Sequence, residues 1–276
     1  MAELRRDFPL KDLLKLVGMP RSSFYYLIAE KVNKNADVKE KIEEIYHQHR
    51  GRYGYRRITQ ELRNQGLIIN HKKVYRLMGE LGLKSMVRIK KYRSYKGKIG
   101  IIAPNRLNRD FAASKPNQKW ATDITEFALF GQKIYISSII DLFNGEIVCY
   151  DLCDKPRFVM VKNTLLKAKK LMKANRGVML HSDQGWHYQK REYREFLAKN
   201  GAIQSMSRKG NCLDNAVKEN FFGIMKSELL YLHQFDSLTH FVRELHKYID
   251  YYNNGRIKAK LKMSPVQYRR LVEAGT

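Results

Sequence analysis

The chain is organised around fifteen residues, SMSRKGNCLDNAVKE, which run from Ser205 to Glu219. The first part is rich in Ser, Gly and Asn, which favours a loop, and Asp214 is a good helix N-cap. Apolar residues then recur at helical spacing, at Val217, Phe221, Ile224 and Met225. Glu219 therefore falls in the first turns of a helix, away from its apolar stripe and near the positive end of its dipole. A carboxylate there is either a surface residue that suits the dipole or a functional group.

Two further carboxylates lie upstream, where secondary structure alone does not account for them. Asp183 follows a short apolar run and precedes a Gly turn, so it stands where a strand ends. Asp123 interrupts the strand-like alternation of residues 120–127, although Asp is a poor strand residue. Carboxylates from two strands and a helix can converge at one end of a sheet and hold two Mg²⁺ or Mn²⁺ ions, since hard cations prefer oxygen ligands. An unrelated set of surface acids is the alternative, and spacing alone leaves it open.

The amino-acid sequence of these segments resembles that of a known family. His-Ser-Asp-Gln-Gly around Asp183, followed by Ser-Arg-Lys-Gly-Asn-Cys-Leu-Asp-Asn-Ala-x-x-Glu, is similar to bacterial insertion-sequence transposases of the copy-out, paste-in type. Thirty-five residues separate Asp183 from Glu219, which is the spacing of that family, and Lys226 matches its basic residue seven positions after the glutamate. The resemblance extends from the Arg-Tyr-Gly-Tyr-Arg-Arg run near residue 52 to Ser264-Pro265.

The resemblance implies a retroviral-integrase-like catalytic core. It implies that Asp123, Asp183 and Glu219 form an Asp-Asp-Glu triad that binds two metal ions and catalyses DNA cleavage and strand transfer. Lys226 and Asn215 are expected to contact DNA. The partners would be double-stranded DNA, namely the terminal inverted repeats of an element and its target, with a homo-oligomer assembled on that DNA. The family commonly fuses this product to an upstream reading frame; no sustained heptad appears here, which fits the downstream part and leaves open whether it acts alone.

Composition is consistent with a nucleic-acid partner. The 276 residues include 53 Lys and Arg against 27 Asp and Glu, a formal net charge of +26. Residues 1–116 hold 27 of the basic and 11 of the acidic side chains. Such an excess predicts a polyanionic partner, because releasing counterions from phosphates drives association. Charge alone does not separate DNA from RNA.

The cysteines and the hydropathy limit the class further. Cys149, Cys153 and Cys212 form no Cys-x-x-Cys pair, so we expect no disulfide framework and a cytoplasmic, nucleoid-associated protein. Because no cysteine precedes residue 149, the zinc domain of the retroviral relatives is expected to be absent, and we expect no structural zinc. No apolar run has the length of a membrane span, and no signal peptide is indicated.

The N-terminal part of the chain is predicted to form short helices of a kind that can bind DNA. Residues 8–30 predict two short helices around a Gly-Met-Pro break, an outline shared by DNA-reading units and by many small bundles. Further helices are expected from Val38 to about residue 80, and Asn70 should cap the last one. The basic residues expected to bind DNA here are Arg56, Arg57, Lys72, Lys73 and Arg76. A solvated basic face is the alternative.

Residues 84–98 contain seven basic residues and no acidic one, with two tyrosines between them. We expect a basic linker that orders on DNA, with Lys90, Lys91 and Arg93 on phosphates. A solvated hinge is the alternative, and the two are compatible.

The rest of the chain predicts three strands, at about 118–128, 134–141 and 146–151, followed by helices that alternate with strands. This order predicts a ribonuclease H-like α/β core with a mixed five-stranded sheet and flanking helices, preceded by small all-α helix-turn-helix regions. The expected division is a helix-turn-helix-like segment (1–33), a second helical DNA-binding region (34–83), a basic linker (84–115), the catalytic core (116–254) and a basic C-terminal tail (255–276).

Other interpretations of the function stay open: a nuclease of the same fold without strand transfer, or a DNA-binding regulator. His240 and Arg243 also spell the His-x-x-Arg of tyrosine recombinases, but the tyrosines follow too closely. His181 and His187 suit a hard metal less well than carboxylates do, and we expect His181 to pack beside Asp183.

Overall fold

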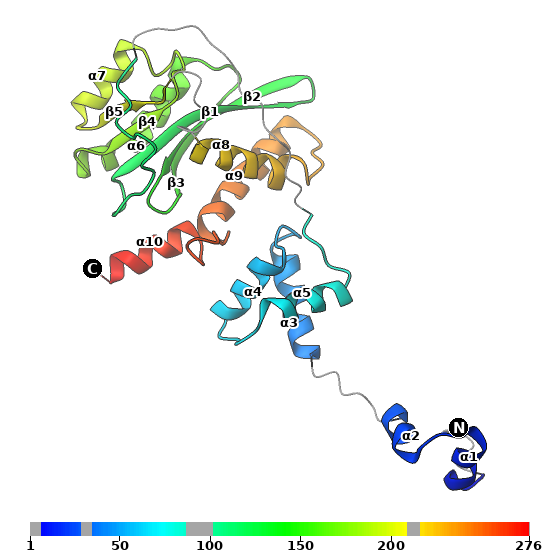
Figure 1. Ribbon diagram of the computed structural model, residues 1–276. Coiled ribbons are helices and arrows are strands. Elements are labelled where there is room, and N and C mark those ends of the chain that lie inside the picture. The colour runs from blue at the N-terminus through cyan, green and yellow to red at the C-terminus, as the bar shows by residue number, and fades with distance from the viewer. Residues whose placement is uncertain (1–6, 29–34, 87–101, 209–215, 276) are drawn as a thin grey trace.

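The computed structural model describes residues 7–28, 35–86, 102–208 and 216–275 (Figure 1). The α-helices are α1 (Leu10–Val17), α2 (Arg21–Ile28), α3 (Ala36–Gln48), α4 (Tyr55–Asn64), α5 (His71–Glu80), α6 (Phe158–Ala174), α7 (Arg191–Lys199), α8 (Ala216–Met225), α9 (Leu238–Asn254) and α10 (Pro265–Ala274). The strands are β1 (Lys119–Leu129), β2 (Gln132–Asp141), β3 (Ile147–Cys153), β4 (Met179–Ser182) and β5 (Ile203–Met206). A π-helical segment, η3 (Lys226–Leu230), continues α8. None of the described helices is long and apolar enough to cross a membrane.

The five strands form one mixed sheet in the order β3-β2-β1-β4-β5. Strands β1, β2 and β3 are antiparallel neighbours, whereas β4 runs parallel to β1 and β5 parallel to β4. Phe130 and Gly131 make the β1–β2 turn, with φ of 53° and 71°. Two consecutive positive φ values give a turn whose twist matches that of the flanking strands, which is why glycine suits the second position. The predicted mixed five-stranded sheet is confirmed.

Helices cover both faces of the sheet and thereby divide the core in two (Figure 1). On one face, α6 and α7 pack around Trp120, Ile139 and Leu180. On the other, α8, η3 and α9 pack around Phe127, Ile136 and other side chains of β1 to β3. Since alternate residues of a strand point to opposite faces, the odd-numbered Asp123 shares the face of Phe127, the side that α8 covers.

The three-helix unit α3–α5 has its own apolar core. Ile42, Ile45, Ile58, Leu62, Val74 and Leu77 are fully or almost fully buried in it. The Asn70 side chain accepts the Lys72 N–H at 2.9 Å, which confirms the predicted cap of α5. Helices α1 and α2 also form as expected, and Gly18, with φ of 65°, ends α1 in the left-handed conformation.

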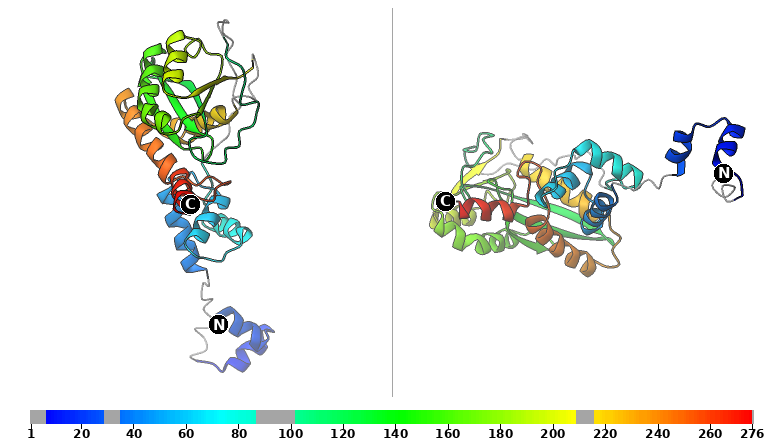
Figure 2. Two further views of the ribbon diagram at one scale, coloured as in Figure 1. Left: turned by 90° about the vertical axis from the view of Figure 1, so that its left-hand side faces the viewer. Right: turned by 90° about the horizontal axis from the view of Figure 1, so that it is seen from below.

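Two segments differ from expectation. The predicted basic tail contains helix α10, which begins with a capping box between Ser264 and Gln267 and packs against α9 (Figure 2). Its Arg269 is bound to the buried carboxylate of Asp141 at 2.7 Å. The later part of the predicted linker lies against the core, because the Arg106 and Leu107 N–H groups donate to Ser205 Oγ. Residues 87–101, with most of the predicted linker charge, lie outside the described residues.

Candidate active site

Two of the three predicted carboxylates lie at adjoining positions of neighbouring strands. The paired residues of β1 and β4 include Ala121 and His181. Two residues further along each parallel strand come Asp123 and Asp183. Asp183 is the first residue after β4, so its side chain stands at the carboxyl end of the strand, and Asp123 lies within the longer β1 beside it.

Backbone hydrogen bonds orient both carboxylates. Asp183 Oδ1 accepts the Gly185 N–H at 2.8 Å, and Asp123 Oδ1 accepts the Ile124 N–H at 2.7 Å. A Cβ at position 185 would lie 2.9 Å from Asp183 Oδ1, which explains why the turn after Asp183 contains glycine. Burial raises the pKa of the Asp183 carboxyl group, which is partly opposed by the Gly185 hydrogen bond and by His187. A neighbouring cation would favour the charged form of this partly buried group.

A buried tyrosine lies close to both aspartates. Tyr188 is almost fully buried, and burial, then the charges of Asp123 and Asp183, raise its pKa well above the usual value. The charges of both carboxylates therefore act on the same phenol.

The third predicted carboxylate belongs to α8. Phe221, Phe222 and Met225 bury this helix against the sheet, and α8 packs on β1, the strand of Asp123. The backbone of Glu219 is in α8, but its side chain and the whole of Asn215 lie outside what the structure describes. Among the described residues, which do not include the Glu219 side chain, no group of three or more His, Cys, Asp and Glu could hold a metal ion.

Lys226 is the first residue of η3 and faces the sheet. Its Nζ lies 5.6 Å from the centroid of the Phe127 ring on β1, so the lysine is half-buried and does not lie opposite the core. Burial lowers the pKa of Lys226, and the charge of Glu126 opposes this. Phe127 and Asp123 are four residues apart on β1, roughly 13 Å at the rise of a strand. The lysine is thus beside the strand that carries the first aspartate.

The two histidines near Asp183 are bonded within the protein. His181, buried on β4, is hydrogen-bonded through Nδ1 to Ser205 Oγ at 2.9 Å. His187 is bonded through Nε2 to the Pro156 carbonyl at 2.7 Å, and burial lowers its pKa. The expectation that His181 packs beside Asp183 stays a prediction.

The basic residues predicted to bind DNA divide into different environments. Lys72 and Arg76 are exposed on α5, Lys73 is half-buried there, and Arg76 pairs with Glu80 at 3.4 Å. Arg56 is exposed and rests on the ring of Tyr55. Arg57 instead pairs with Glu228 at 3.4 Å and lies over the Tyr53 ring, so its charge is engaged inside the protein. Lys90, Lys91 and Arg93 lie outside the described residues.

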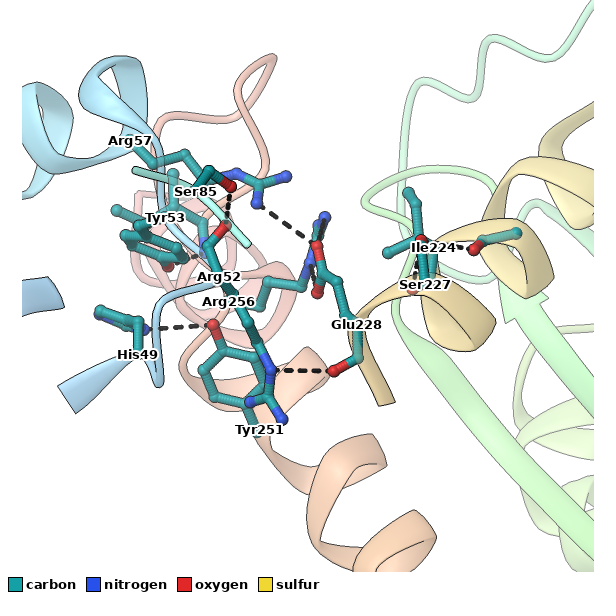
Figure 3. A network of polar contacts seen from close by, with 12 residues as sticks. His49, Arg52, Tyr53, Arg57, Ser85, Ile224, Ser227, Glu228, Tyr251 and Arg256 are labelled. Carbon is teal, nitrogen blue, oxygen red and sulfur yellow. Dashed lines mark hydrogen bonds and ion pairs between the residues drawn. The ribbon is translucent and has the colours of Figure 1, made fainter. Parts of the chain in front are cut away.

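Arg57 belongs to an interface that no sequence pattern indicated. Figure 3 shows the α3–α4 connection meeting η3 and the end of α9 around Glu228. The Arg52 Nε donates to the Glu228 carbonyl at 3.1 Å, and His49 is bonded to the Tyr251 hydroxyl at 3.2 Å. The three-helix unit α3–α5 is therefore attached to the segment that directly continues α8.

Comparison with known proteins identifies the class. An integrase core domain matches residues 113–212 and again 219–272, and an HTH-like domain matches residues 33–92. The putative transposase InsK for insertion sequence element IS150 from Escherichia coli (strain K12) is 52% identical over 270 residues, which cover 97% of this chain and 95% of that protein. The transposase for insertion sequence element IS904 from Lactococcus lactis subsp. lactis (strain IL1403) is 35% identical over 226 residues, covering 81% and 89%. A solved structure of the HTLV-2 integrase catalytic core domain in complex with magnesium is 16% identical with a TM-score of 0.44, covering 56% of this chain and 98% of that chain.

The fold is thus that of an integrase core preceded by an HTH-like domain. The chain belongs to the family of insertion-sequence transposases.

Proposed function

We propose that this transposase cuts and joins DNA strands through Asp123, Asp183 and Glu219. The observation that carries the proposal is the pairing of β1 with β4, which brings Asp123 level with Asp183. Helix α8, which contains Glu219, covers the face to which Asp123 belongs. This arrangement supports our proposal that carboxylates from two strands and the covering helix meet at one end of the sheet.

The residues suit a hard divalent cation. Both aspartates offer carboxylate oxygens, and backbone N–H groups already fix one oxygen of each. Oxygen ligands of this kind are preferred by Mg²⁺ and Mn²⁺. Two such ions, when bound, would stabilise the charge that develops on the attacking and leaving oxygens of a phosphodiester.

The chain itself would position the reacting groups. A water molecule, and later a DNA 3′-hydroxyl, attacks phosphorus in line and gives up a proton to solvent. A new P–O bond forms while the bond to the leaving 3′-oxygen breaks, and that oxygen takes up a proton from solvent. No side chain becomes covalently attached to DNA in this scheme. Lys226 would hold a phosphate near the reacting strand, because phosphate contacts position DNA.

The partners we propose are the element's terminal repeats and the target duplex. The +26 charge favours binding to phosphates. Lys72 and Arg76 are exposed on α5 and Lys73 is half-buried there, and we propose that these three residues contact DNA. We further propose that the successive domains of the chain end at residues 33, 83, 115 and 254. We also propose that several copies assemble on DNA at the nucleoid and that this chain is the downstream part of a fusion.

A cleavage and joining assay tests the proposal. The full chain is incubated with Mg²⁺ and a labelled duplex that carries the terminal sequence of its element, and products are resolved on a denaturing gel. Shorter cleaved strands and longer joined strands are both expected. Asp123→Asn, Asp183→Asn and Glu219→Gln should each lower both products by orders of magnitude while DNA binding changes only a few-fold. Asp236→Asn, at a side chain that is 90% exposed, is the matched control and should react like the parent.

The same gel separates the alternatives. Cleaved strands without joined strands would indicate a nuclease. Binding without either product would indicate a regulator, and normal products from Glu219→Gln would remove that residue from the triad.

A further inference from the structure

We propose that Trp186 is a stacking site for an unstacked nucleobase of the DNA held at Asp123 and Asp183. The inference rests on the proposed function and adds a base contact to a site otherwise made of carboxylates. The proposed occupant is a single base that no longer stacks on its neighbours in the duplex. This base belongs either to the element end or to the target.

The first observation is the exposure of a large aromatic ring beside the site. Trp186 comes three residues after Asp183 and is 51% exposed. The other tryptophan of the chain, Trp120, has no exposed surface and lies in the core. Exposing so much apolar area costs about 25 cal/mol per Å² in the absence of a partner, so a bound ligand that covers the ring is favoured.

The second observation is that the ring is held in place and its position is tied to Asp183. The Trp186 indole stacks on the His187 imidazole with a centroid distance of 3.8 Å and an interplanar angle of 29°. His187 is itself anchored to the Pro156 carbonyl, and the Gly185 N–H anchors the loop to Asp183. An aromatic surface with few remaining rotamers binds a second ring at a low entropic cost.

The third observation is the neighbouring charge. Lys190 Nζ lies 5.4 Å from the Trp186 ring centroid and 5.0 Å from that of Phe158. Cations interleaved with aromatic rings are the usual composition of single-strand binding surfaces, where the rings stack on bases and the cations contact phosphates. A nucleotide offers both groups at once.

The surroundings favour a nucleobase over a protein partner. The residues that flank Trp186 in the chain, Gly185 and His187, are small or polar, and the Lys190 ammonium lies beside the ring, so charged and polar groups border the indole. A protein interface would need a contiguous apolar surface of several hundred Å². An indole also has no access to the face of a base within an intact duplex, so the base that it contacts must be unstacked.

Intrinsic fluorescence gives a direct test, because only Trp186 of the two tryptophans is exposed. The full chain is titrated with an oligonucleotide of eight thymidylates in the absence of divalent metal, so that no cleavage occurs. We expect the emission of the parent to be quenched on binding and the emission of Trp186→Phe, which comes from Trp120, to stay constant. Quenching that persists unchanged in Trp186→Phe would overturn the proposal.

A scan with abasic nucleotides identifies the base. A single base is removed at each position within five nucleotides of the cleavage point, in the element end in one series and in the target in another. Base–aromatic stacking predicts that one removal weakens binding of the parent about fivefold to a hundredfold and leaves Trp186→Ala unaffected at that position. The series in which this happens assigns the base to the end or to the target. Equal effects of every removal on the parent and on Trp186→Ala would overturn the proposal.

Phe130→Ala is the matched control, since Phe130 is a similarly exposed ring (53%) at the β1–β2 turn, away from Asp183. It should bind like the parent at every abasic position. This outcome is independent of the proposed chemistry. If one base removal weakens the parent but not Trp186→Ala, and the parent never cleaves DNA, the stacking site stands and the proposed reaction is contradicted. If the parent cleaves DNA and no removal distinguishes it from Trp186→Ala, the reaction stands and the stacking site is contradicted.

Discussion

Arg256 and Glu228 form a buried, two-pronged ion pair. Arg256 Nε donates to one carboxylate oxygen of Glu228 and Nη2 to the other, each at 2.8 Å, and the two side chains are 3% and 2% exposed. The Tyr248 hydroxyl adds a third hydrogen bond at 3.0 Å. Burial acts to raise the pKa of Glu228, but the Arg256 hydrogen bonds and the charges of Arg256 and Arg57 outweigh it and hold the pKa low. The carboxylate is therefore charged and fully engaged where η3, α9 and the α3–α4 connection meet (Figure 3).

Glu228→Gln should destabilise the protein strongly. The variant keeps the size of the side chain but leaves the Arg256 guanidinium buried without its counter-charge. Breaking one half of a buried ion pair costs about 3–5 kcal/mol, so the free energy of unfolding should fall by that amount in chemical denaturation.

Glu195→Gln is the matched control for this loss. Glu195 pairs with Arg191 at 2.6 Å, but its side chain is 60% exposed. A surface pair contributes about 0–1 kcal/mol, so this variant should unfold almost like the parent. Similar stabilities of the two glutamine variants would contradict the role given to Glu228.

The environment of His49, at the same interface, predicts that the free energy of unfolding depends on pH. The imidazole is buried, stacks on the Tyr53 ring at 3.7 Å and is bonded to Tyr251. Burial, aided by Arg52 and Arg57, lowers the pKa of His49 from the usual 6.5 to about 4. Between these values the unfolded chain binds a proton that the folded protein does not. The free energy of unfolding should therefore decrease as the pH falls from 6.5 to about 4, by at most about 1.4 kcal/mol per pH unit.

His49→Phe isolates this contribution. The phenyl ring retains the stacking on Tyr53 and has no proton to bind, so the variant should lose less stability than the parent between pH 6.5 and 4.5. The measurement is the difference between the two denaturation free energies at each pH. A constant difference over this range would show that His49 does not titrate in the expected window.

Local patterns account for most of the fold. The alternation of residues 118–128 predicts β1, and Asn70 predicts the start of α5, because both signals depend on near neighbours in the chain. Asp123 and Asp183 stand out in the sequence because Asp is a poor strand residue, and the structure puts them at adjoining positions of β1 and β4; their role in catalysis stays a prediction.

The interface around Glu228 depends on contacts that have no local signature. Arg52 and the Glu228 carbonyl are separated by 176 residues, and the periodicity of either segment says nothing about the other. The contacts of Arg52 and Arg57 with Glu228 were therefore not predicted, and Arg57 was expected to bind DNA. Helix α10 was not predicted, because the lysines that precede it and its own Arg269 and Arg270 indicated a basic tail, although Ser264 and Gln267 form a capping box.

The basic segment that contains Lys90, Lys91 and Arg93 should bind phosphates of the DNA backbone. Replacing all three by Ala should weaken binding to any DNA sequence about equally. The slope of log K against log salt should become shallower by roughly 0.9 for each phosphate that the variant no longer neutralises. Lys169, Lys170 and Lys173, exposed on α6, provide a control with the same change of net charge when they are replaced by Ala. An equal change of slope in the two triple variants would show that only the net charge matters.

Lys226 is expected to position the DNA end without taking part in the chemistry. Its Nζ lies above the Phe127 ring, on the strand that carries Asp123 and roughly 13 Å from that residue along the strand. We expect Lys226 to contact a phosphate of the DNA end whose scissile bond lies at the aspartates. Lys226→Ala should lower joining of a correct element end much more than it lowers non-specific DNA binding. The loss should shrink at high concentrations of the end, because a positioning contact acts through affinity. Lys226→Arg should restore much of the activity, since it keeps the cation over the ring. Joining rates of Lys226→Ala equal to those of the parent at limiting DNA would leave Lys226 with a packing role on Phe127 alone.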